Sequence, residues 1–284
     1  ESTKQAYLHY IEQNKPDALI VVCSQTWTLD WLLSDLKKIT CAKIFYSHGY
    51  SAWKEKYPFG EQIKRRNILG VWSLLKNKWY YDKLYQKIAM FDRAIYLSEE
   101  NNSALYAQKY GLTNGRVLKN AIDDCFFEPQ MQHTYENKKT LRFLFVANYN
   151  DNKNQKSLIE VFAKADIGKS QLVLVGFEEN AYSDMLKQYA REVLQGQQQK
   201  EVVFKTHINR EQVIDQYRIC DVFVCSSKKE AYPVVAHEAG ATGMPIISTD
   251  VGIYKKITGV YLVNNGEQMK EAMQNLYNHP EERK

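Results

Sequence analysis

Two glutamates, Glu230 and Glu238, stand eight positions apart in the stretch EAYPVVAHEAGATGMPIIST at residues 230–249. Two carboxylates held close together could serve as the acid and the base of a hydrolase. The spacing alone does not decide this, because two glutamates at such a distance arise by chance in many helices. The elements around the pair must show where each side chain is held.

Short apolar runs alternate with longer segments of helical periodicity along the chain. The runs are rich in β-branched residues and largely continuous, which is typical of strands buried on both faces of a parallel sheet. They lie at residues 17–23, 42–47, 93–97, 141–147, 171–176, 201–205, 221–225 and 245–249. The helical segments lie at residues 28–39, 154–165, 181–194 and 209–219. This alternation predicts an α/β protein built of parallel sheets with right-handed crossovers.

The glutamate pair follows one of the predicted strands. The run at 221–225 leads into the loop SSKKEAY and then into a helix that we expect to begin at Pro233. Ligands of open α/β sheets bind at the carboxyl ends of strands, and a proline is favoured at the first helical position. The free N–H groups of Val234, Val235 and Ala236, together with the helix dipole, would form an anion site.

Length and composition limit the class of protein. A chain of 284 residues with 44% hydrophobic and 25% charged residues fits two domains of about 100–150 residues each. No apolar run approaches the roughly 18–20 residues of a membrane-spanning helix, and no signal peptide is recognisable. The five scattered cysteines have no CxxC spacing, which argues against a disulfide framework or a zinc site and favours a reducing cytoplasm.

The segment 54–87 is basic and aromatic. It carries nine basic and three acidic residues, a net charge of +6 against +5 for the whole chain. Ile68, Trp72, Leu75 and Trp79 recur in it at helical spacing. Two interpretations stay open: an amphipathic helix that docks on its own domain, or a face that rests on anionic membrane lipid. No nucleic-acid motif accompanies the charge, so nucleic acid is not expected as a partner.

Several ordered landmarks resemble the retaining glycosyltransferases of family 4, which have the GT-B fold of two Rossmann-like domains facing a cleft. Glu230-x7-Glu238 is similar to the family's donor-binding motif. FVANYNDNKNQKSLIEVFAKA (145–165) resembles the first strand, loop and helix of its nucleotide-sugar domain. NAIDDCFFEP (120–129) resembles the closing segment of the acceptor domain, and residues 44–49 and 96–111 match earlier landmarks. The resemblance covers most of the chain from about residue 17 onward.

The resemblance implies a role for the residues of the glutamate motif. Glu230 would accept hydrogen bonds from hydroxyl groups of the donor sugar and support positive charge at the anomeric carbon. Glu238 would accept from the 2′- and 3′-hydroxyls of the nucleotide's ribose. Backbone groups of Tyr232, Val234 and Val235 would bind the diphosphate. Without a ligand role, Glu230 would be a solvated loop residue and Glu238 an exposed helical one.

A lysine and an asparagine stand at the family's phosphate-binding positions. Lys153 aligns with the lysine that offsets the charge of the leaving diphosphate, although it could also be an ordinary surface lysine. The arginine usual four to five residues earlier is replaced by Asn148, which can donate a hydrogen bond but carries no charge. Lys156 could compensate, the diphosphate could be held less tightly, or the protein could have lost catalysis.

Three histidines have different expected roles. His48 stands where the family places a histidine that faces the cleft, and it could contact the transferred sugar, assist proton transfer or cap its own turn. His207, in the loop Thr206–Ile208, is a candidate contact for the donor base. His237 points away from its neighbour Glu238 on the helix, so we expect it to be structural.

The sequence favours a donor site without a metal or cofactor. It has no Asp-x-Asp, the metal-binding arrangement of the other main glycosyltransferase fold, and no GxGxxG, GxxxxGK[ST] or HExxH motif. Helix N–H groups and Lys153 would then stabilise the diphosphate.

The domain organisation follows from the family order. We expect an acceptor-side domain at residues 1–130, a linker at 131–140, a nucleotide-sugar domain at 141–265 and a C-terminal helix at 266–284. The amino-terminal half has only about four strands, which is short for this fold, so we expect that an N-terminal segment of the family's fold is missing before Glu1.

Together these features predict a metal-independent cytoplasmic enzyme that transfers a sugar, with retention, from a nucleoside-diphosphate sugar to a glycan or lipid-linked acceptor. Retention follows from the resemblance alone. Two alternatives stay open: a non-catalytic GT-B subunit that binds glycan, nucleotide or a partner glycosyltransferase, and a sugar-nucleotide epimerase or phosphorylase on the same fold. Contact with lipid would place the protein at the inner face of the membrane.

Overall fold

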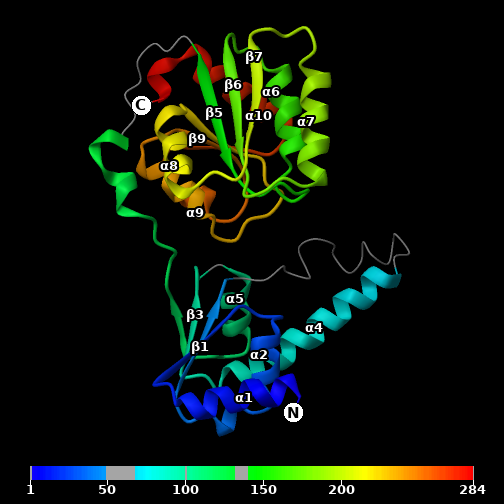
Figure 1. The fold of residues 1–284 in the computed structure, drawn as a ribbon, viewed down its shortest axis with the longest axis vertical. Helices are drawn as coiled ribbons and strands as arrows, with labels where there is room; N and C mark the ends of the chain where they lie inside the picture. The colour runs from blue at the N-terminus through cyan, green and yellow to red at the C-terminus, as the bar shows by residue number, and fades with distance from the viewer. Residues whose placement is uncertain (1, 49–67, 100, 132–139, 284) are drawn as a thin grey trace. The chain divides into compact units, whose positions relative to one another are not determined.

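The computed structural model describes residues 2–48, 68–99, 101–131 and 140–283, and the chain in it divides into two compact units (Figure 1). The first unit spans Glu1–Asn120 and the second Ala121–Lys284. Each unit has a parallel sheet and a buried core of its own. The α/β class and the parallel sheets predicted from the alternating pattern are therefore confirmed.

The sheet of the first unit has four described strands in the order β1-β2-β3-β4, all parallel. They are β1 (Ala18–Val22), β2 (Ala42–Ser47), β3 (Arg93–Tyr96) and β4 (Gly115–Val117). Val21 is in register with Phe45, and Phe45 with Ala94, so three buried side chains form a row across the sheet. Strand β4 escaped the sequence analysis because three residues are too few to give a periodic signal.

Helices α1 (Thr3–Asn14), α2 (Trp27–Leu32), α4 (Ile68–Ile88) and α5 (Asn102–Lys109) accompany this sheet. The single helix predicted at 28–39 is interrupted, because α2 ends at Leu32 and a 3-10 turn follows at Leu36–Lys38. Asp35, between the two pieces, accepts hydrogen bonds from the side chains of Ser34 and Lys38. Such local side-chain bonds compete with the helical backbone pattern and favour a turn.

Helix α4 docks on its unit, but not through the stripe that the sequence indicated. The exposed fractions of Trp72, Leu75 and Trp79 are 70%, 48% and 60%. The docking face consists instead of Leu74, Tyr81, Leu84, Tyr85 and Ile88, all of them buried. This second set continues to the end of the helix, where the rings of Tyr85 and Tyr106 of α5 lie 5.4 Å apart, so the apolar contact extends along the helix to its last turn. Residues 54–67 of the basic segment lie outside the described residues.

The second unit has a six-stranded parallel sheet in the order β10-β9-β8-β5-β6-β7. Its strands are β5 (Leu141–Val146), β6 (Ser170–Val175), β7 (Lys200–Lys205), β8 (Val222–Cys225), β9 (Ile246–Thr249) and β10 (Val260–Val263). Its helices are α6 (Gln155–Lys164), α7 (Ala181–Val193), α8 (Arg210–Ile219), α9 (Val234–Ala241) and α10 (Gly266–Asn278). Helices α6, α7 and α10 lie on one side of the sheet, and α8 and α9 on the other (Figure 1).

The direction of winding reverses between β5 and β8. The chain builds outward from β5 through β6 to β7 and then returns to add β8 on the opposite side of β5. The loops that follow β5 and β8 therefore leave the sheet as neighbours and lead to helices on opposite faces. This is the switch point at which open α/β sheets bind ligands.

Residues 121–131 pack on the second unit, through the turns Asp124–Phe127 and Pro129–Met131. The Phe126 side chain is fully buried, and its ring meets that of Tyr217 edge to face at 5.3 Å. The division of the chain at Asn120 thus lies before the expected boundary at residue 130, because this aromatic contact ties the segment to the second core. Most of the expected linker, residues 132–139, lies outside the described residues.

Candidate functional site

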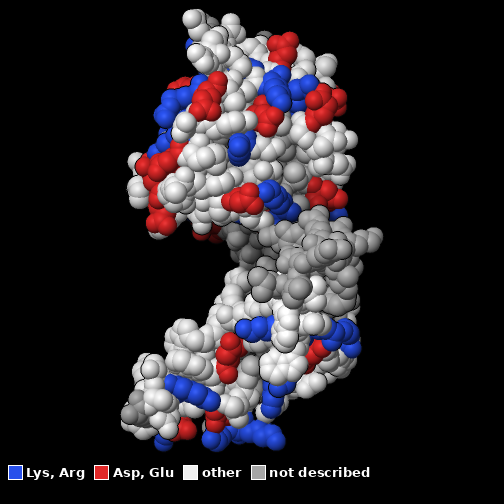
Figure 2. Space-filling view, turned by 90° about the vertical axis from the view of Figure 1, so that its right-hand side faces the viewer, with Lys and Arg blue, Asp and Glu red and all other residues white. Residues whose placement is uncertain are grey.

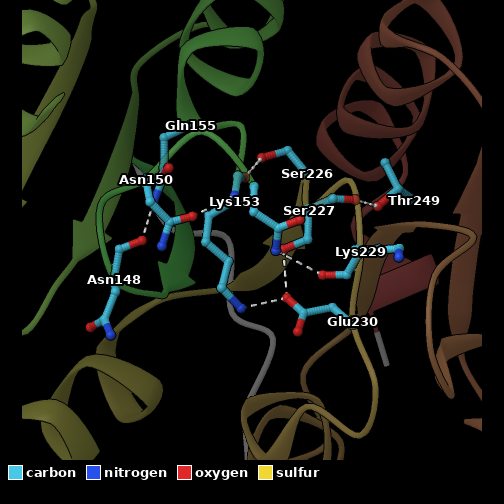
Figure 3. A network of polar contacts seen from close by, with 10 residues as sticks. Asn148, Asn150, Lys153, Gln155, Ser226, Ser227, Lys229, Glu230 and Thr249 are labelled. Atoms are coloured by element: carbon cyan, nitrogen blue, oxygen red, sulfur yellow. Dashed lines mark hydrogen bonds and ion pairs between the residues drawn. The ribbon is translucent and has the colours of Figure 1, made fainter. Parts of the chain in front are cut away.

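Two loops are joined at the switch point of the second sheet. They follow β5 (residues 147–154) and β8 (residues 226–233). The backbone N–H of Lys228 donates to the carbonyl of Asn152 at 2.8 Å, and the Asn152 side chain donates to the carbonyl of Lys229 at 3.0 Å. Ser226 Oγ donates to the carbonyl of Lys153 at 2.9 Å. These bonds hold the residues after the two strands in fixed relative positions (Figure 3).

Glu230 and Lys153 meet across the joined loops. Lys153 Nζ and Ser227 Oγ both donate to Oε1 of Glu230, each at 2.6 Å, and the side chains of Lys153 and Glu230 are 24% and 12% exposed. Oε2 of Glu230 accepts no hydrogen bond from the described residues and points away from Lys153 in Figure 3. Glu230 is therefore neither a solvated loop residue nor fully enclosed: one oxygen is fixed and the other is available.

Gly252, in the loop after β9, lies close against Glu230 and Ala231. It has a left-handed backbone with φ of 59°, and a Cβ added there would lie 3.0 Å from Glu230 Cβ and 3.1 Å from the carbonyl oxygen of Ala231. Only glycine adopts this conformation at little cost and leaves room for the approach. The loop after β9 thus takes part in placing the glutamate.

Glu238 lies on α9 and is buried, with a side chain only 3% exposed. Its Oε1 accepts from Arg210 Nη2 and its Oε2 from the Tyr217 hydroxyl, both at 2.6 Å. Burial raises the pKa of Tyr217 well above its ordinary value, so the hydroxyl keeps its proton and remains a donor. The alternative of an exposed helical glutamate is wrong, because the side chain faces the core around Tyr217 and not the solvent.

Arg210 connects Glu238 to the segment before the second sheet. Its Nη2 and Nε also donate to Oδ2 of Asp123, at 2.8 and 3.2 Å, and its guanidinium lies 5.3 Å from the ring centroid of Phe126. Burial lowers the pKa of Arg210, but the hydrogen bonds to the two carboxylates outweigh it, so the pKa is raised and the cation is permanent. The sequence analysis missed Arg210, Asp123, Tyr217 and Ser227 as site residues.

The start of α9 differs from the prediction by one residue. Pro233 is the N-cap, and α9 begins at Val234. The N–H of Ala236 donates to the carbonyl of Pro233 at 3.3 Å, so it is not free for an anion. Within the described residues, the N–H groups of Val234 and Val235 donate no hydrogen bond. The ring of Tyr232 stacks on His237 at 4.9 Å, which agrees with a structural role for that histidine.

Asn148, at the position of the family's arginine, and Lys156, which could compensate for its charge, both point away from the Lys153–Glu230 pair. Asn148 is exposed, its carbonyl accepts from Gln155 Nε2 at 3.0 Å, and its side chain points away from the pair (Figure 3). Lys156 Nζ lies 4.8 Å above the ring of Tyr189 on α7. Lys156 thus points toward α7 and not toward the loop of Asn148, so it does not compensate for the missing charge there.

The other two histidines lie on exposed surfaces. His48 follows β2 in the first unit, and its ring centroid lies 4.6 Å from that of Tyr46. His207 follows β7, with a left-handed φ of 55° and its N–H donating to the carbonyl of Phe177 at 3.1 Å. His48 belongs to the first unit. His207 lies in the second unit, three residues before Arg210, which begins α8 and binds Glu238.

The described residues show neither a metal cluster nor a membrane-spanning helix. They contain no group of three or more His, Cys, Asp or Glu side chains arranged to hold a metal ion. Over the same residues, no helix has the length and apolar character to cross a membrane.

Comparison with known proteins gives the family and the fold. The family model described as glycosyl transferases group 1 matches residues 126–284. Sucrose-phosphate synthase from Thermosynechococcus elongatus has a TM-score of 0.74 at 18% identity, over 98% of this chain and 69% of that one. Anabaena HepE in complex with UDP has a TM-score of 0.68 at 13% identity, over 98% and 74%.

A third solved structure is the apo form of the lipopolysaccharide outer core galactosyltransferase WaaB, with a TM-score of 0.61 at 15% identity over 97% of this chain and 70% of that one. No match was found among curated proteins. At these identities the likeness concerns the fold, and it confirms the expected GT-B class.

Proposed function

Because this chain belongs to the glycosyl transferases group 1, we propose that it transfers a sugar, with retention, from a nucleoside-diphosphate sugar to a glycan or lipid-linked acceptor. One observation carries the proposal: two carboxylates, each paired with a cation, flank the start of α9 at the switch point of the second sheet. Such a site suits a diphosphate with a hydroxyl-bearing group on either side. The HepE complex with UDP and glucose, on the same fold, supports a donor of this class.

Glu230 binds the donor sugar in this proposal. Its Oε1 is held by Lys153 and Ser227, which fixes the carboxylate and leaves Oε2 for a sugar hydroxyl or for charge at the anomeric carbon. A carboxylate placed in advance needs no reorganisation when positive charge develops, which is how electrostatic stabilisation lowers a barrier. Glu238 binds the ribose hydroxyls with the lone pairs that Arg210 and Tyr217 leave unused.

In this proposal Lys153 pairs with Glu230 in the ligand-free protein and with both Glu230 and the diphosphate when the donor is bound. In the ligand-free protein its ammonium neutralises Glu230, and with donor bound it lies between that carboxylate and the diphosphate. A cation in this position reduces repulsion between two anions that the reaction requires close together. The N–H groups of Val234 and Val235, with Tyr232 before them, add backbone donors without a metal or cofactor. Activity is then expected to persist in EDTA.

Asn148 and the histidines complete the proposed donor site. Asn148 is proposed to donate one hydrogen bond to the diphosphate after a change of rotamer. Because asparagine carries no charge, the site then has one cation fewer than it would have with an arginine at this position. His207 is proposed to contact the base. His48, from the first unit, is proposed to contact the transferred sugar.

The missing arginine also favours a second candidate, a GT-B subunit that binds a nucleotide, a glycan or a partner glycosyltransferase but does not catalyse sugar transfer.

Thermal unfolding with a panel of nucleoside diphosphates and their sugars identifies the donor, since a ligand at 100 times its Kd stabilises by about 2.7 kcal/mol. Donor hydrolysis and transfer are then compared between wild type and Glu230→Ala, with the exposed Glu271→Ala on α10 as the control. If Glu230→Ala leaves both rates unchanged, the enzyme assignment fails and the binding subunit stands.

The exposed stripe of α4 supports a peripheral contact with anionic membrane at the cytoplasmic face. Trp72, Leu75 and Trp79 are exposed next to three exposed lysines, Lys76, Lys83 and Lys87, and Lys83 Nζ lies 3.8 Å above the Trp79 ring. Figure 2 shows several basic side chains, with acidic ones among them, on the face of the first unit turned to the viewer. Tryptophan beside lysine suits the headgroup region, where each Lys near an anionic surface contributes about 1 kcal/mol.

Sedimentation with liposomes tests this contact. Neutral phosphatidylcholine vesicles are compared with vesicles that contain phosphatidylglycerol, at low and high salt. Binding is expected only to the anionic vesicles, with a decrease in salt and in the Lys76→Glu/Lys83→Glu double variant. Charge reversal at Lys64, Arg65 and Arg66 extends the test to the rest of the basic segment, and the exposed Lys169→Glu in the second unit is the control. Equal sedimentation in all conditions would remove the membrane contact from the proposal.

A further inference from the structure

Arg210 is an exposed cation next to the glutamate motif that is held by three partners. Although its side chain is 49% exposed, it is bound to two carboxylates and lies over an aromatic ring. Exposed ion pairs usually contribute little, because a long side chain must give up its freedom for a screened attraction. Here Asp123 and Phe126 already restrict the guanidinium, so less freedom remains to be lost when it binds Glu238.

The carboxylate of Glu238 has two unlike sides. Oε2 faces the core, where the fully buried Tyr217 donates to it, and Oε1 faces Arg210. A carboxylate oxygen has two lone pairs, so each oxygen can accept one further hydrogen bond. Because the Glu238 side chain is only 3% exposed, the direction of those remaining lone pairs is set by its two partners.

We propose that Arg210 is a positioning residue for the nucleotide: it fixes the carboxylate of Glu238 so that its remaining lone pairs meet the 2′- and 3′-hydroxyls of the ribose. The inference rests on the ribose contact proposed for Glu238. Arg210 acts through Glu238 and takes no part in the chemical step, so its effect belongs to the donor's Kd and KM and not to kcat.

A buried carboxylate that lost its cation would rotate or draw in water. Removal of one partner from such a pair leaves an uncompensated charge, which is costly even where the intact pair contributes little. Lysine in place of Arg210 would keep the charge but could not bind Asp123 and Glu238 through a planar fork. Arg210→Lys is therefore expected to recover part of the function and Arg210→Gln none, with Asp123→Asn giving an intermediate loss.

The test is a thermodynamic cycle in which the Arg210 side chain and the ribose hydroxyls are removed separately and together, and the binding free energies are compared. Wild type and Arg210→Gln are titrated by calorimetry with whichever of UDP, GDP or ADP binds the wild type best, and with the 2′,3′-dideoxy form of that nucleotide. We expect Arg210→Gln to weaken the ribonucleotide at least about tenfold, the range of one charge-assisted hydrogen bond, and the dideoxy form less than about twofold. Binding of the dideoxy form also shows that the variant is folded.

The control is Arg218→Gln on the same helix. Arg218 is 47% exposed and pairs with Asp215, so it matches Arg210 in residue type and exposure and is also paired with a carboxylate, but that partner is not Glu238. It is expected to bind both nucleotides as the wild type does. Equal losses for the two nucleotides in Arg210→Gln, or no loss, would overturn the inference while the proposed donor site stands. A wild type that binds none of the three nucleotides would overturn the donor site and, with it, this inference.

Discussion

Lys153 Nζ and Glu230 Oε1 lie 2.6 Å apart although 77 positions separate the two residues in the chain. They come from loops after β5 and β8, strands that are neighbours only because the winding of the sheet reverses between them. Both side chains are largely shielded from water, so each compensates the charge of the other. A ligand with a diphosphate and hydroxyl groups can take over both halves of this pair.

Lys153→Met removes the cation at the diphosphate. Coulombic attraction grows with the charge of the ligand, so we expect the Kd of a nucleoside diphosphate to rise at least about tenfold and that of the uncharged nucleoside to change little. Calorimetric titration of both ligands measures the difference, with the exposed Lys169→Met as the control. Equal weakening of both ligands would show that Lys153 acts only by holding Glu230 in place.

Asn148→Arg restores the cation that the family usually carries. Because the loop is exposed at this position, the substitution is expected to leave the thermal midpoint unchanged and to lower the Kd of the nucleoside diphosphate about three- to tenfold. Gln198→Arg, at an exposed position in the loop before β7, is the control for added charge alone. The same gain in both variants would mean that the position of the charge does not matter.

Gly252→Ala places a methyl group against Glu230. A left-handed backbone costs an alanine about 1–2 kcal/mol, and the new Cβ would also push on the Cβ of Glu230 at 3.0 Å. Gly196→Ala has a similar φ of 83° but meets nothing within 4 Å, so it carries the backbone cost alone. We expect a loss in the free energy of unfolding, measured in urea, in both variants and a larger one in Gly252→Ala, but a large loss of sugar transfer only in Gly252→Ala.

Tyr217→Phe leaves Oε2 of the buried Glu238 without its donor. An unsatisfied buried acceptor costs about 1–3 kcal/mol of the free energy of unfolding. Tyr254→Phe is the control, since Tyr254 is equally buried and its hydroxyl is not bonded to a carboxylate. Urea unfolding should show the cost for Tyr217→Phe and about 0.5 kcal/mol or less for Tyr254→Phe; equal values would mean that the Glu238 contact contributes nothing.

Tyr96 gives the first unit a specific sensitivity to alkali. Burial raises its pKa to about 12, above the ordinary value of 10, and its hydroxyl has no hydrogen-bond partner among the described residues. The folded state therefore keeps the proton longer than the unfolded state, so this contribution is complete below pH 10 and is lost as the pH rises from 10 to 12. The stability of Tyr96→Phe relative to wild type, followed by circular dichroism in urea, should therefore be greater at pH 11 than at pH 8; an equal difference at both pH values would contradict this.

The order of strands and helices could be read from the sequence, because local periodicity reports burial on each element. All eight predicted runs became strands, and the loop that carries Glu230 follows the carboxyl end of one of them, β8, as predicted. The partners could not be read in the same way. Arg210 is 28 positions from Glu238 and Asp123 is 87 from Arg210, and nothing in their local sequence marks these contacts.

By itself, the sequence determined the alternation of elements, the lysine and the glutamate in the two loops and the second glutamate on the following helix, since these depend on residue type and on short-range patterns. Only the tertiary structure decided that Lys153 neutralises Glu230, that Tyr217 and Arg210 enclose Glu238, and which face of α4 is buried. The physical reason is that charge pairing and burial depend on which strands become neighbours, and the neighbours of β5 were set by the crossover of the whole sheet.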